Sequence, residues 1–340
     1  MIDASADGIV LLVDVLDRLS DPGTLARIAI EGLGKASVYL IISVGLTLIF
    51  GLMGVLNFAH GAMAMLGAYL GGIFMLWTVS GSMGAVTVVA LFFVAMAVVG
   101  AAIAGFGTAI EVKLVRRIYD RTPMYQILLT FGVALILEEM TRILATYYGV
   151  LPESQWSEAM GTIPAVLDDR HGVFGAQIRG LYAFEIILGI VAAIGVYLFL
   201  TRTLYGLYIR AGSEDAEMAQ ALGIDVRRAF TVVFGLGTGL AAVGGVLLMW
   251  DPLWGPTVHL NIDVLLYAFV VVIIGGLGSY KGTVAAALIV GLADSLTTWV
   301  FDAGIVDHPG LPAVTIFLLL VVMLMLRPQG LFGIEEVGGH

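Results

Sequence analysis

Apolar segments long enough to cross a lipid bilayer recur along this chain, and they restrict its fold more than any other feature. They span residues 35–52, 61–79, 84–108, 125–147, 182–201, 229–250, 264–278, 282–301 and 311–326. A helix needs roughly 20 apolar residues to cross a hydrocarbon core about 30 Å thick. Only 12% of the residues are charged, against about 25% in an ordinary soluble domain. The sequence therefore excludes a soluble globular protein and predicts an all-α polytopic integral membrane protein with about nine transmembrane helices, the plausible range being eight to ten.

The distribution of Lys and Arg over the connections predicts the orientation of these helices. Ten basic residues fall on one set of connections and four on the other. The larger set comprises Lys113, Arg116, Arg117, Arg121, Arg202, Arg210, Arg227, Arg228, Lys281 and Arg327. Because cytoplasmic loops are enriched in Lys and Arg, we expect the C-terminus to be cytoplasmic and the N-terminus to be outside.

The chain divides into a tail, one membrane domain and a short end. Residues 1–34 form an N-terminal tail, and its weakly amphipathic part, residues 9–19, favours an interfacial helix over a loose tail. Residues 35–333 form the membrane domain and residues 334–340 a C-terminal tail. The membrane domain has two long connections, an external one at 148–181 that suits a small lid or docking surface and a cytoplasmic one at 202–228.

The cytoplasmic connection contains the signals of one short helix of about nine residues. Ser213 suits the N-cap, and Gly223 suits a left-handed residue after the last turn. The acidic residues of the first turn favour the positive end of the helix dipole; they are Glu214, Asp215 and Glu217. One apolar stripe remains, formed by Met218, Ala221 and Leu222. This stripe either packs on the ends of the chain's own helices or docks into a groove of a soluble partner.

Two short interruptions separate apolar segments without room for an ordinary loop. The first contains Asn57, Phe58, His60 and Gly61, and the second contains Gly275, Gly276 and Gly278. Non-helical backbone at membrane depth is tolerated only where it is buried in protein or lines a wet cavity. These seven residues are therefore candidates for a translocation pathway. The alternative is that Asn57 caps the following helix and His60 holds a buried backbone group.

A few charged residues lie inside the apolar segments and need partners. Glu138 and Glu139 can both reach Arg142 at helical spacing, which favours a structural ion pair over contact with a substrate. Asp294 favours a hydrogen bond between helices, with a substrate ammonium as the alternative. The Gly-x-x-x-Gly spacings at 67–71 and 235–239 predict close helix packing, either within the chain or against a second subunit.

Four motifs carry a family resemblance that extends over residues 34–333. They are the Glu-Asp-x-Glu-x-Ala-x-x-Leu-Gly-Ile pattern at 214–224, the segment 45–69 with Asn-Phe-Ala-His-Gly at its centre, the Gly-rich stretch 275–283 and the closing Arg-Pro-Gln-Gly-Leu-Phe-Gly at 327–333. The chain resembles the permease subunits of ATP-binding-cassette importers of the branched-chain amino acid class. Among the two permease types of that system, it is more similar to the H-type.

The resemblance implies a non-catalytic permease domain in a bacterial inner membrane. Its partners would be a second homologous permease, two cytoplasmic ATPase subunits that contact residues 213–224, and an extracytoplasmic substrate-binding protein, with no nucleic acid. No phosphate-binding loop of the Gly-x-x-x-x-Gly-Lys-Ser/Thr type occurs, so we expect no cofactor in this chain and ATP use by its partners. The implied activity is import of leucine, isoleucine and valine by alternating access.

Three other functions remain open from the sequence. The same family imports urea, short amides or other small polar solutes through closely similar permeases. An ion-gradient-driven secondary transporter would need ionisable residues around a midplane site, for which only Glu138, Glu139 and Arg142 are available. A membrane scaffold would transport nothing and would leave the two interruptions without a purpose.

Overall fold

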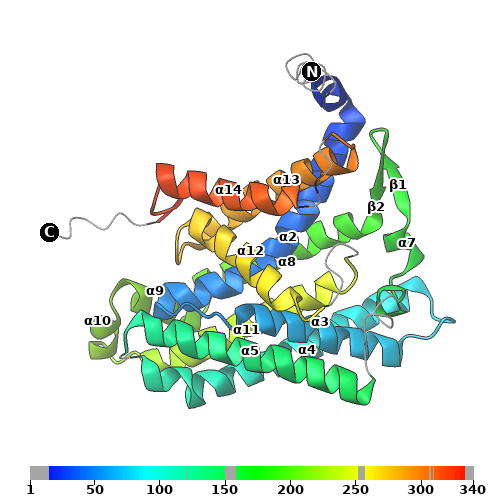
Figure 1. Ribbon diagram of the computed structural model, residues 1–340. Coiled ribbons are helices and arrows are strands. Elements are labelled where there is room, and N and C mark those ends of the chain that lie inside the picture. The colour runs from blue at the N-terminus through cyan, green and yellow to red at the C-terminus, as the bar shows by residue number, and fades with distance from the viewer. Residues whose placement is uncertain are drawn as a thin grey trace.

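The computed structural model describes residues 15–119, 121–149, 158–251, 257–305, 308 and 310–333. Every predicted apolar segment coincides with a helix (Figure 1). These helices are α2 (Pro22–Met53), α3 (His60–Thr78), α4 (Ala85–Lys113), α5 (Pro123–Tyr148), α8 (Gly180–Arg202), α11 (Val226–Leu248), α12 (Leu260–Gly275), α13 (Tyr280–Asp302) and α14 (Leu311–Leu326).

Shorter elements occupy the connections. A 3-10 turn, η1 (Val115–Ile118), follows α4, and the cytoplasmic connection folds into α9 (Leu204–Glu214) and α10 (Ala216–Ala221). The connection before α8 contains α7 (Ala165–Asp168) and an antiparallel hairpin of β1 (Arg170–Val173) and β2 (Ala176–Arg179), with Arg170 opposite Arg179. This hairpin is a small exception to the predicted all-α class. The predicted interfacial helix at 9–19 lies largely outside the described residues, of which 15–20 are helical.

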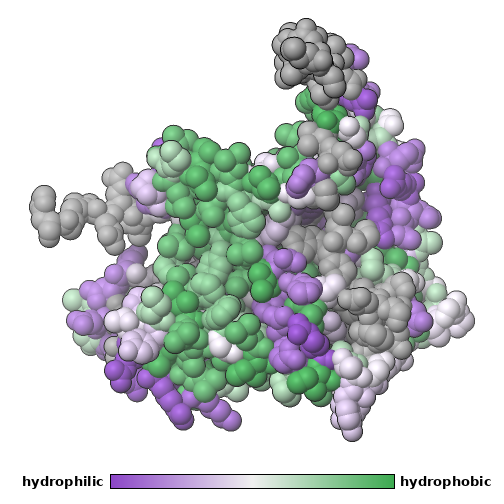
Figure 2. Space-filling view, viewed as in Figure 1, coloured by the Kyte–Doolittle hydropathy of each residue, from purple (hydrophilic) through white to green (hydrophobic). Residues whose placement is uncertain are grey.

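Length and composition make the fold that of a multi-pass membrane protein. In the described part of the chain, six helices are long and apolar enough to cross a bilayer: α2, α3, α4 extended by η1, α8, α11 and α13. The apolar helices α12 and α14 have 16 residues each. The 26-residue α5 carries three charged residues in its second half. Figure 2 shows a broad hydrophobic area over part of the visible face, with hydrophilic residues beside it, as a lipid-facing or subunit-facing surface requires.

Helix α2 is the centre of the fold, and it begins earlier than predicted. In its most apolar window, 83% of the residues are buried, against 28% in α8. It starts at Pro22 rather than at residue 35, with Asp21 accepting a hydrogen bond from the Thr24 amide at 2.9 Å. The extra turns carry charged residues, which lowered the apparent hydropathy of this stretch. Those charges are paired, for example Arg27 with Asp302 of α13 at 2.8 Å, so the helix runs on without interruption.

Small residues let α11 pack closely on three neighbours. A Cβ added at Gly237 would lie 2.6 Å from the Gly45 carbonyl oxygen of α2. A Cβ at Gly67 of α3 would collide with the backbone of Ala242, and one at Gly235 with the Thr108 hydroxyl of α4. Both predicted glycine spacings therefore face the inside of this chain, and they give it a tightly packed core.

Candidate functional site

The two predicted interruptions lie side by side. Helix α2 ends at Met53 and α3 begins at His60, while α12 ends at Gly275 and α13 begins at Tyr280. A Cβ added at Gly51, in the last turn of α2, would lie 3.0 Å from the Cα of Gly278 in the second interruption. Segments more than two hundred residues apart in sequence thus meet at one end of the helix bundle.

The closing motif packs on the same place. The amide of Leu331 donates to the Ile274 carbonyl at 2.8 Å, and that of Phe332 donates to Gly275 at 3.1 Å. These bonds satisfy carbonyl groups at the end of α12 that have no partner within the helix. Gly276 has φ +99°, and a Cβ there would lie 2.5 Å from the Gly333 amide nitrogen. The interruption therefore requires glycine, and three of the motifs found in the sequence converge on one structural unit.

Asn57 and His60 are completely buried in the first interruption. The Asn57 Oδ1 accepts from the Ala59 amide at 3.1 Å, and the His60 Nε2 lies 2.9 Å from the Ile42 carbonyl oxygen of α2. Each side chain keeps one buried nitrogen, Nδ2 or Nδ1, for which the described residues offer no partner. His60 thus lies against a buried backbone group, as the alternative interpretation has it, whereas the N-cap of α3 is Ala59, whose amide donates to Asn57, and no side chain caps this helix. Contact of either side chain with a transported solute stays a prediction.

The other predicted pathway residues fill space around the interruptions. Phe58 packs on Phe269 of α12, with ring centroids 5.0 Å apart, and edge-on against Phe131 of α5 at 6.5 Å. A Cβ at Gly61 would collide with the Asn261 carbonyl oxygen, so α3 and α12 touch backbone to backbone here. These contacts position α3, α5 and α12 relative to one another.

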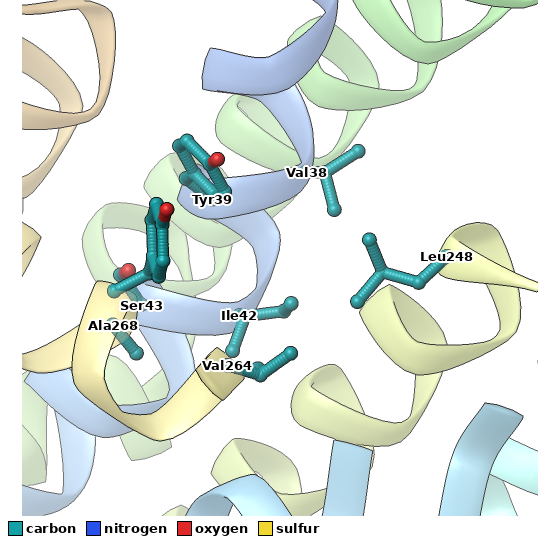
Figure 3. A pocket seen from close by; sticks show the side chains of 8 residues that line it. Val38, Tyr39, Ile42, Ser43, Leu248, Val264 and Ala268 are labelled. Atoms are coloured by element: carbon teal, nitrogen blue, oxygen red, sulfur yellow. The ribbon is translucent and has the colours of Figure 1, made fainter. Parts of the chain in front are cut away.

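The space between α2, α11 and α12 is closed. A cavity of only about 10 Å³ remains there, surrounded by apolar side chains that include Val38, Ile42, Leu248 and Val264 (Figure 3). This volume holds one water molecule at most. The packed side chains of these three helices therefore leave little room at this point.

A much larger cavity, of about 420 Å³, lies between α2, α12, α13 and α14. Four charged residues, two hydroxyl residues and several apolar residues share its wall: Lys35, Asp263, Asp294, Asp302, Thr298, Tyr267, Leu266, Phe301, Pro312, Ala313 and Phe317. Tyr267 also lines the small closed cavity. The two cavities are thus neighbours, separated by the tyrosine.

A buried ion pair forms part of the large cavity's wall. The Lys35 ammonium lies 3.0 Å from Asp294 Oδ1 and donates to the Thr298 hydroxyl at 2.9 Å. The exposed fraction of the side chain is 4% for Lys35 and 6% for Asp294. The Tyr39 hydroxyl donates to the other Asp294 oxygen. Asp294 therefore bonds between helices, as the sequence favoured. Its ammonium partner is this chain's own Lys35, the first residue of the predicted span, for which the sequence indicated no partner.

The cytoplasmic connection forms two helices instead of one. The N-cap of α10 is Asp215, whose Oδ1 accepts from the Met218 amide at 2.8 Å. Ser213 belongs to the last turn of α9 and donates to the Arg210 carbonyl at 2.9 Å. The predicted cap and the helix of about nine residues are thus wrong, because α9 continues through Glu214 and leaves six residues for α10. Gly223 has φ +85°, the left-handed conformation expected after the last turn.

The apolar residues of α10 face outward. The exposed fraction is 57% for Met218 and 76% for Leu222, and Ala221 is exposed as well. Ala219 is the buried residue of this turn. The stripe does not pack on the described helices of the chain, which leaves it available to a partner. The acidic residues Glu214, Asp215 and Glu217 are exposed beside it.

The end of the bundle near α10 is held by a polar cluster that sequence reasoning missed. Glu111 of α4 is completely buried and accepts from Arg116 at 3.0 and 2.9 Å, from Tyr119 at 2.5 Å and from Thr231 of α11 at 2.9 Å. Burial, together with the hydrogen bond to Glu111, raises the pKa of Tyr119 above its ordinary value. The i,i+5 spacing of Glu111 and Arg116 was the available signal, and it is not a regular helical spacing.

The charged residues of α5 pair with each other. Arg142 lies 3.2 Å from Glu138 and 2.8 Å from Glu139. Glu138 also accepts from the Asn261 side chain of α12 at 3.1 Å. The Arg142 and Glu139 side chains are 48% and 56% exposed on the outer surface of the chain. This pair therefore links α5 to α12 on one side and presents charge to the surroundings on the other.

Comparison with known proteins gives one consistent result over most of the chain. A family model described as "Branched-chain amino acid transport system / permease component" matches residues 28–326. The high-affinity branched-chain amino acid transport system permease protein LivH of Escherichia coli K12 is 29% identical over 90% of this chain and 95% of its own length. BraD of Pseudomonas aeruginosa, with the same description, is 29% identical over 91% and 95%. A probable LivM permease of Methanocaldococcus jannaschii is 23% identical over 86% and 90%.

Proposed function

Because the chain belongs to the family of permease components of branched-chain amino acid transport systems and is of the H-type, we propose that it is the transmembrane subunit of a binding-protein-dependent, ATP-driven importer. Its cargo is branched-chain amino acids, which it translocates across the bacterial cytoplasmic membrane by alternating access. The chain contributes the gated pathway and no catalysis. ATP binds to separate subunits.

The proposed topology has nine spans, with the N-terminus outside and the C-terminus in the cytoplasm. The shorter helices α12 and α14 and the charged α5 complete the six long spans. Both interruptions then lie toward the cytoplasmic end, within the membrane domain. The excess of Lys and Arg on the connections of that side supports this orientation.

The single observation that carries the proposal is the exposed apolar stripe on α10. In the proposed topology α10 is cytoplasmic, where an exposed leucine and methionine gain from being covered by protein. A helix face of this kind fits a hydrophobic groove. We assign that groove to an ATPase subunit, one for this chain and one for a second, homologous permease. An extracytoplasmic binding protein delivers substrate to the opposite side.

Affinity isolation of the tagged chain, expressed with its native operon in mild detergent, tests the assembly. Met218→Asp and Leu222→Asp place a carboxylate on the stripe and should each reduce the recovered ATPase about ten-fold, because burying the exposed 57% and 76% of these side chains is worth about 1–2 kcal/mol each. The second permease should stay bound. Phe174→Asp is the matched control, because Phe174 is an 82% exposed apolar residue on the hairpin.

Uptake by the reconstituted complex tests the transport assignment. Vesicles that contain the complex and its binding protein should accumulate leucine, isoleucine or valine only when ATP is supplied on the cytoplasmic side. Isolation of the chain by itself, or uptake by the chain alone that needs an ion gradient and no ATP, would contradict the importer assignment. Uptake of amides in place of these amino acids would contradict the proposed cargo.

A further inference from the structure

The large cavity between α2, α12, α13 and α14 combines charged groups of both signs with an apolar wall. We propose that it is a binding site for one zwitterionic α-amino acid with an apolar side chain. In this site Lys35 contacts the carboxylate, Asp263 contacts the ammonium, and the apolar residues contact the side chain. This inference rests on the proposed function and states where in this chain the cargo is held during transport.

The cavity has the size and the composition of a small-molecule site. Its volume of about 420 Å³ falls in the usual range of about 300–1,000 Å³ for such pockets. Lipid-facing grooves have no need of ionisable side chains, which are costly in hydrocarbon. Here four charged residues from three helices share one wall with several apolar ones. That combination matches a ligand with two charges and an apolar side chain.

Lys35 is built to hold a carboxylate. An ammonium group has three N–H donors, and two of those of Lys35 go to Asp294 and Thr298. Among the described residues, the third has no acceptor, although the ammonium is almost fully buried. Asp294 neutralises Lys35 within the chain, and the remaining donor is the one that a ligand's carboxylate would use. A charge-assisted hydrogen bond formed at this shielded position is stronger than one formed in water.

Asp263 is suited to hold the ammonium. It lies in the first turn of α12, lines the cavity and is exposed. No side chain that the structure describes hydrogen-bonds to its carboxylate, whereas the neighbouring Asp302 is paired with Arg27 at 2.8 Å. Asp263 thus forms no ion pair within 4 Å among the described residues, with the charge of His259 one turn before it as its electrostatic neighbour, while the ammonium of Lys35 on α2 is shared with Asp294. Both ends of a zwitterion find a complementary group.

The apolar part of the wall selects the side chain. Leu266 of α12, Phe301 of α13 and Phe317 of α14 line the cavity together with Pro312 and Ala313. Each buried methylene of a ligand gains about 0.8 kcal/mol in such surroundings. The site therefore favours leucine, isoleucine and valine over glycine or over a polar amino acid of similar size.

The position of the cavity suits a transported ligand. Tyr267 forms part of its wall and packs on Tyr39, with ring centroids 5.2 Å apart. Beyond these rings lies the cavity of about 10 Å³ that is closed by apolar side chains. A bound amino acid is therefore stopped at this point until α2 and α12 move apart.

Direct binding to the purified importer complex tests the proposal. Tritium-labelled leucine is titrated without ATP and without the binding protein, and unlabelled leucinamide and isocaproate compete. Ala313→Trp fills the cavity and should weaken leucine binding about ten-fold or more. Val314→Trp is the matched control, because Val314 is the next residue of α14 and is 59% exposed, and it should change the affinity less than two-fold.

The charged groups are tested by the choice of ligand. Leucinamide lacks the carboxylate and isocaproate lacks the ammonium, so each should compete at least about ten-fold more weakly than leucine. Asp263→Asn should weaken leucine binding about ten-fold and leave isocaproate competition unchanged. Equal competition by all three compounds would indicate a merely apolar groove, such as one that takes a lipid chain, and would overturn the proposal.

ATP-driven leucine uptake in the same preparation separates the two hypotheses. Normal uptake together with normal leucine binding by Ala313→Trp would refute the binding site while leaving the importer assignment intact. Absence of leucine uptake by the wild-type complex would refute the proposed cargo. Absence of leucine binding by a complex that still transports leucine would refute the site alone.

Discussion

The ion pair between Lys35 and Asp294 leads to a quantitative prediction. Asp294 is bonded to Lys35, Tyr39 and Thr298, and neither charged group is exposed by more than 6%. Asp294→Asn keeps the shape of the side chain and removes its charge, which takes the ion-pair partner from an almost fully buried ammonium. Removing one partner of a buried ion pair costs about 3–5 kcal/mol. We expect Asp294→Asn to lower the free energy of unfolding by that amount.

A second variant separates the charge from the packing. Lys35→Met/Asp294→Leu replaces both partners with apolar side chains, and such replacements are often neutral or stabilising. We expect it to recover most of the stability lost in Asp294→Asn. The double variant should therefore be more stable than Asp294→Asn, although it changes more side chains. Lost packing alone would give the opposite order.

The assay is unfolding of the purified chain in mixed micelles, followed by tryptophan fluorescence. Asp168→Asn is the control, because the ion pair of Asp168 with Arg179 has a 52% exposed carboxylate and should contribute less than about 1 kcal/mol. A loss below about 1 kcal/mol in Asp294→Asn would refute the reasoning, because the Lys35 ammonium would then have to be hydrated. Equal losses in the single and double variants would also refute it.

Three further changes should follow the packing and the ion pairs in the same unfolding assay. Gly45→Ala should lower the free energy of unfolding by about 1–3 kcal/mol, because its Cβ would collide with the Gly237 carbonyl oxygen. The control is Gly105→Ala, whose Cβ meets open space in α4 and which should be neutral or stabilise by up to about 1 kcal/mol. Equal effects of the two variants would contradict the close approach of α2 and α11. Glu111→Gln should lower the free energy of unfolding by about 1–3 kcal/mol, because it weakens the hydrogen bonds to Arg116, Tyr119 and Thr231. An unchanged unfolding midpoint would show that this cluster does not stabilise the fold. Arg142→Gln should cost less than about 1 kcal/mol in detergent, because Arg142 and Glu139 are half exposed, and a loss of several kcal/mol would indicate that this pair is shielded.

The positions of the apolar helices follow from local composition. Every apolar segment of the sequence coincides with a helix, because the free energy of leaving water is dominated by the side chains of the segment itself. The start of α2 does not follow from it. The charges of Arg27 and Lys35 are neutralised by Asp302 and Asp294, residues more than two hundred positions away. A hydropathy profile contains no information about such pairs, so it predicts a tail where the first turns of α2 lie.

The cytoplasmic connection shows a different limit. Ser213 and Asp215 are both good N-cap residues, and the sequence alone gives no reason to prefer the second. The choice is made by α9, which is capped by Thr203 and continues through Glu214. The exposure of Met218 and Leu222 could be anticipated from their spacing as a stripe. The stripe stays uncovered because of the position in which α9 and α11 hold α10. The sequence pattern contains no information about that position.

Helix α2 connects the features that were recognised separately. Its N-terminal half carries Lys35 at the large cavity, its middle offers the Ile42 carbonyl to His60, and its last turn approaches the second interruption at Gly278. A Cβ at Gly212 of α9 would lie 2.9 Å from Leu52, so α9, which leads directly into α10, packs on the same last turn. At 32 residues, α2 is about 48 Å long. We therefore expect a displacement of α10 to reach the cavity through α9 and this one continuous helix.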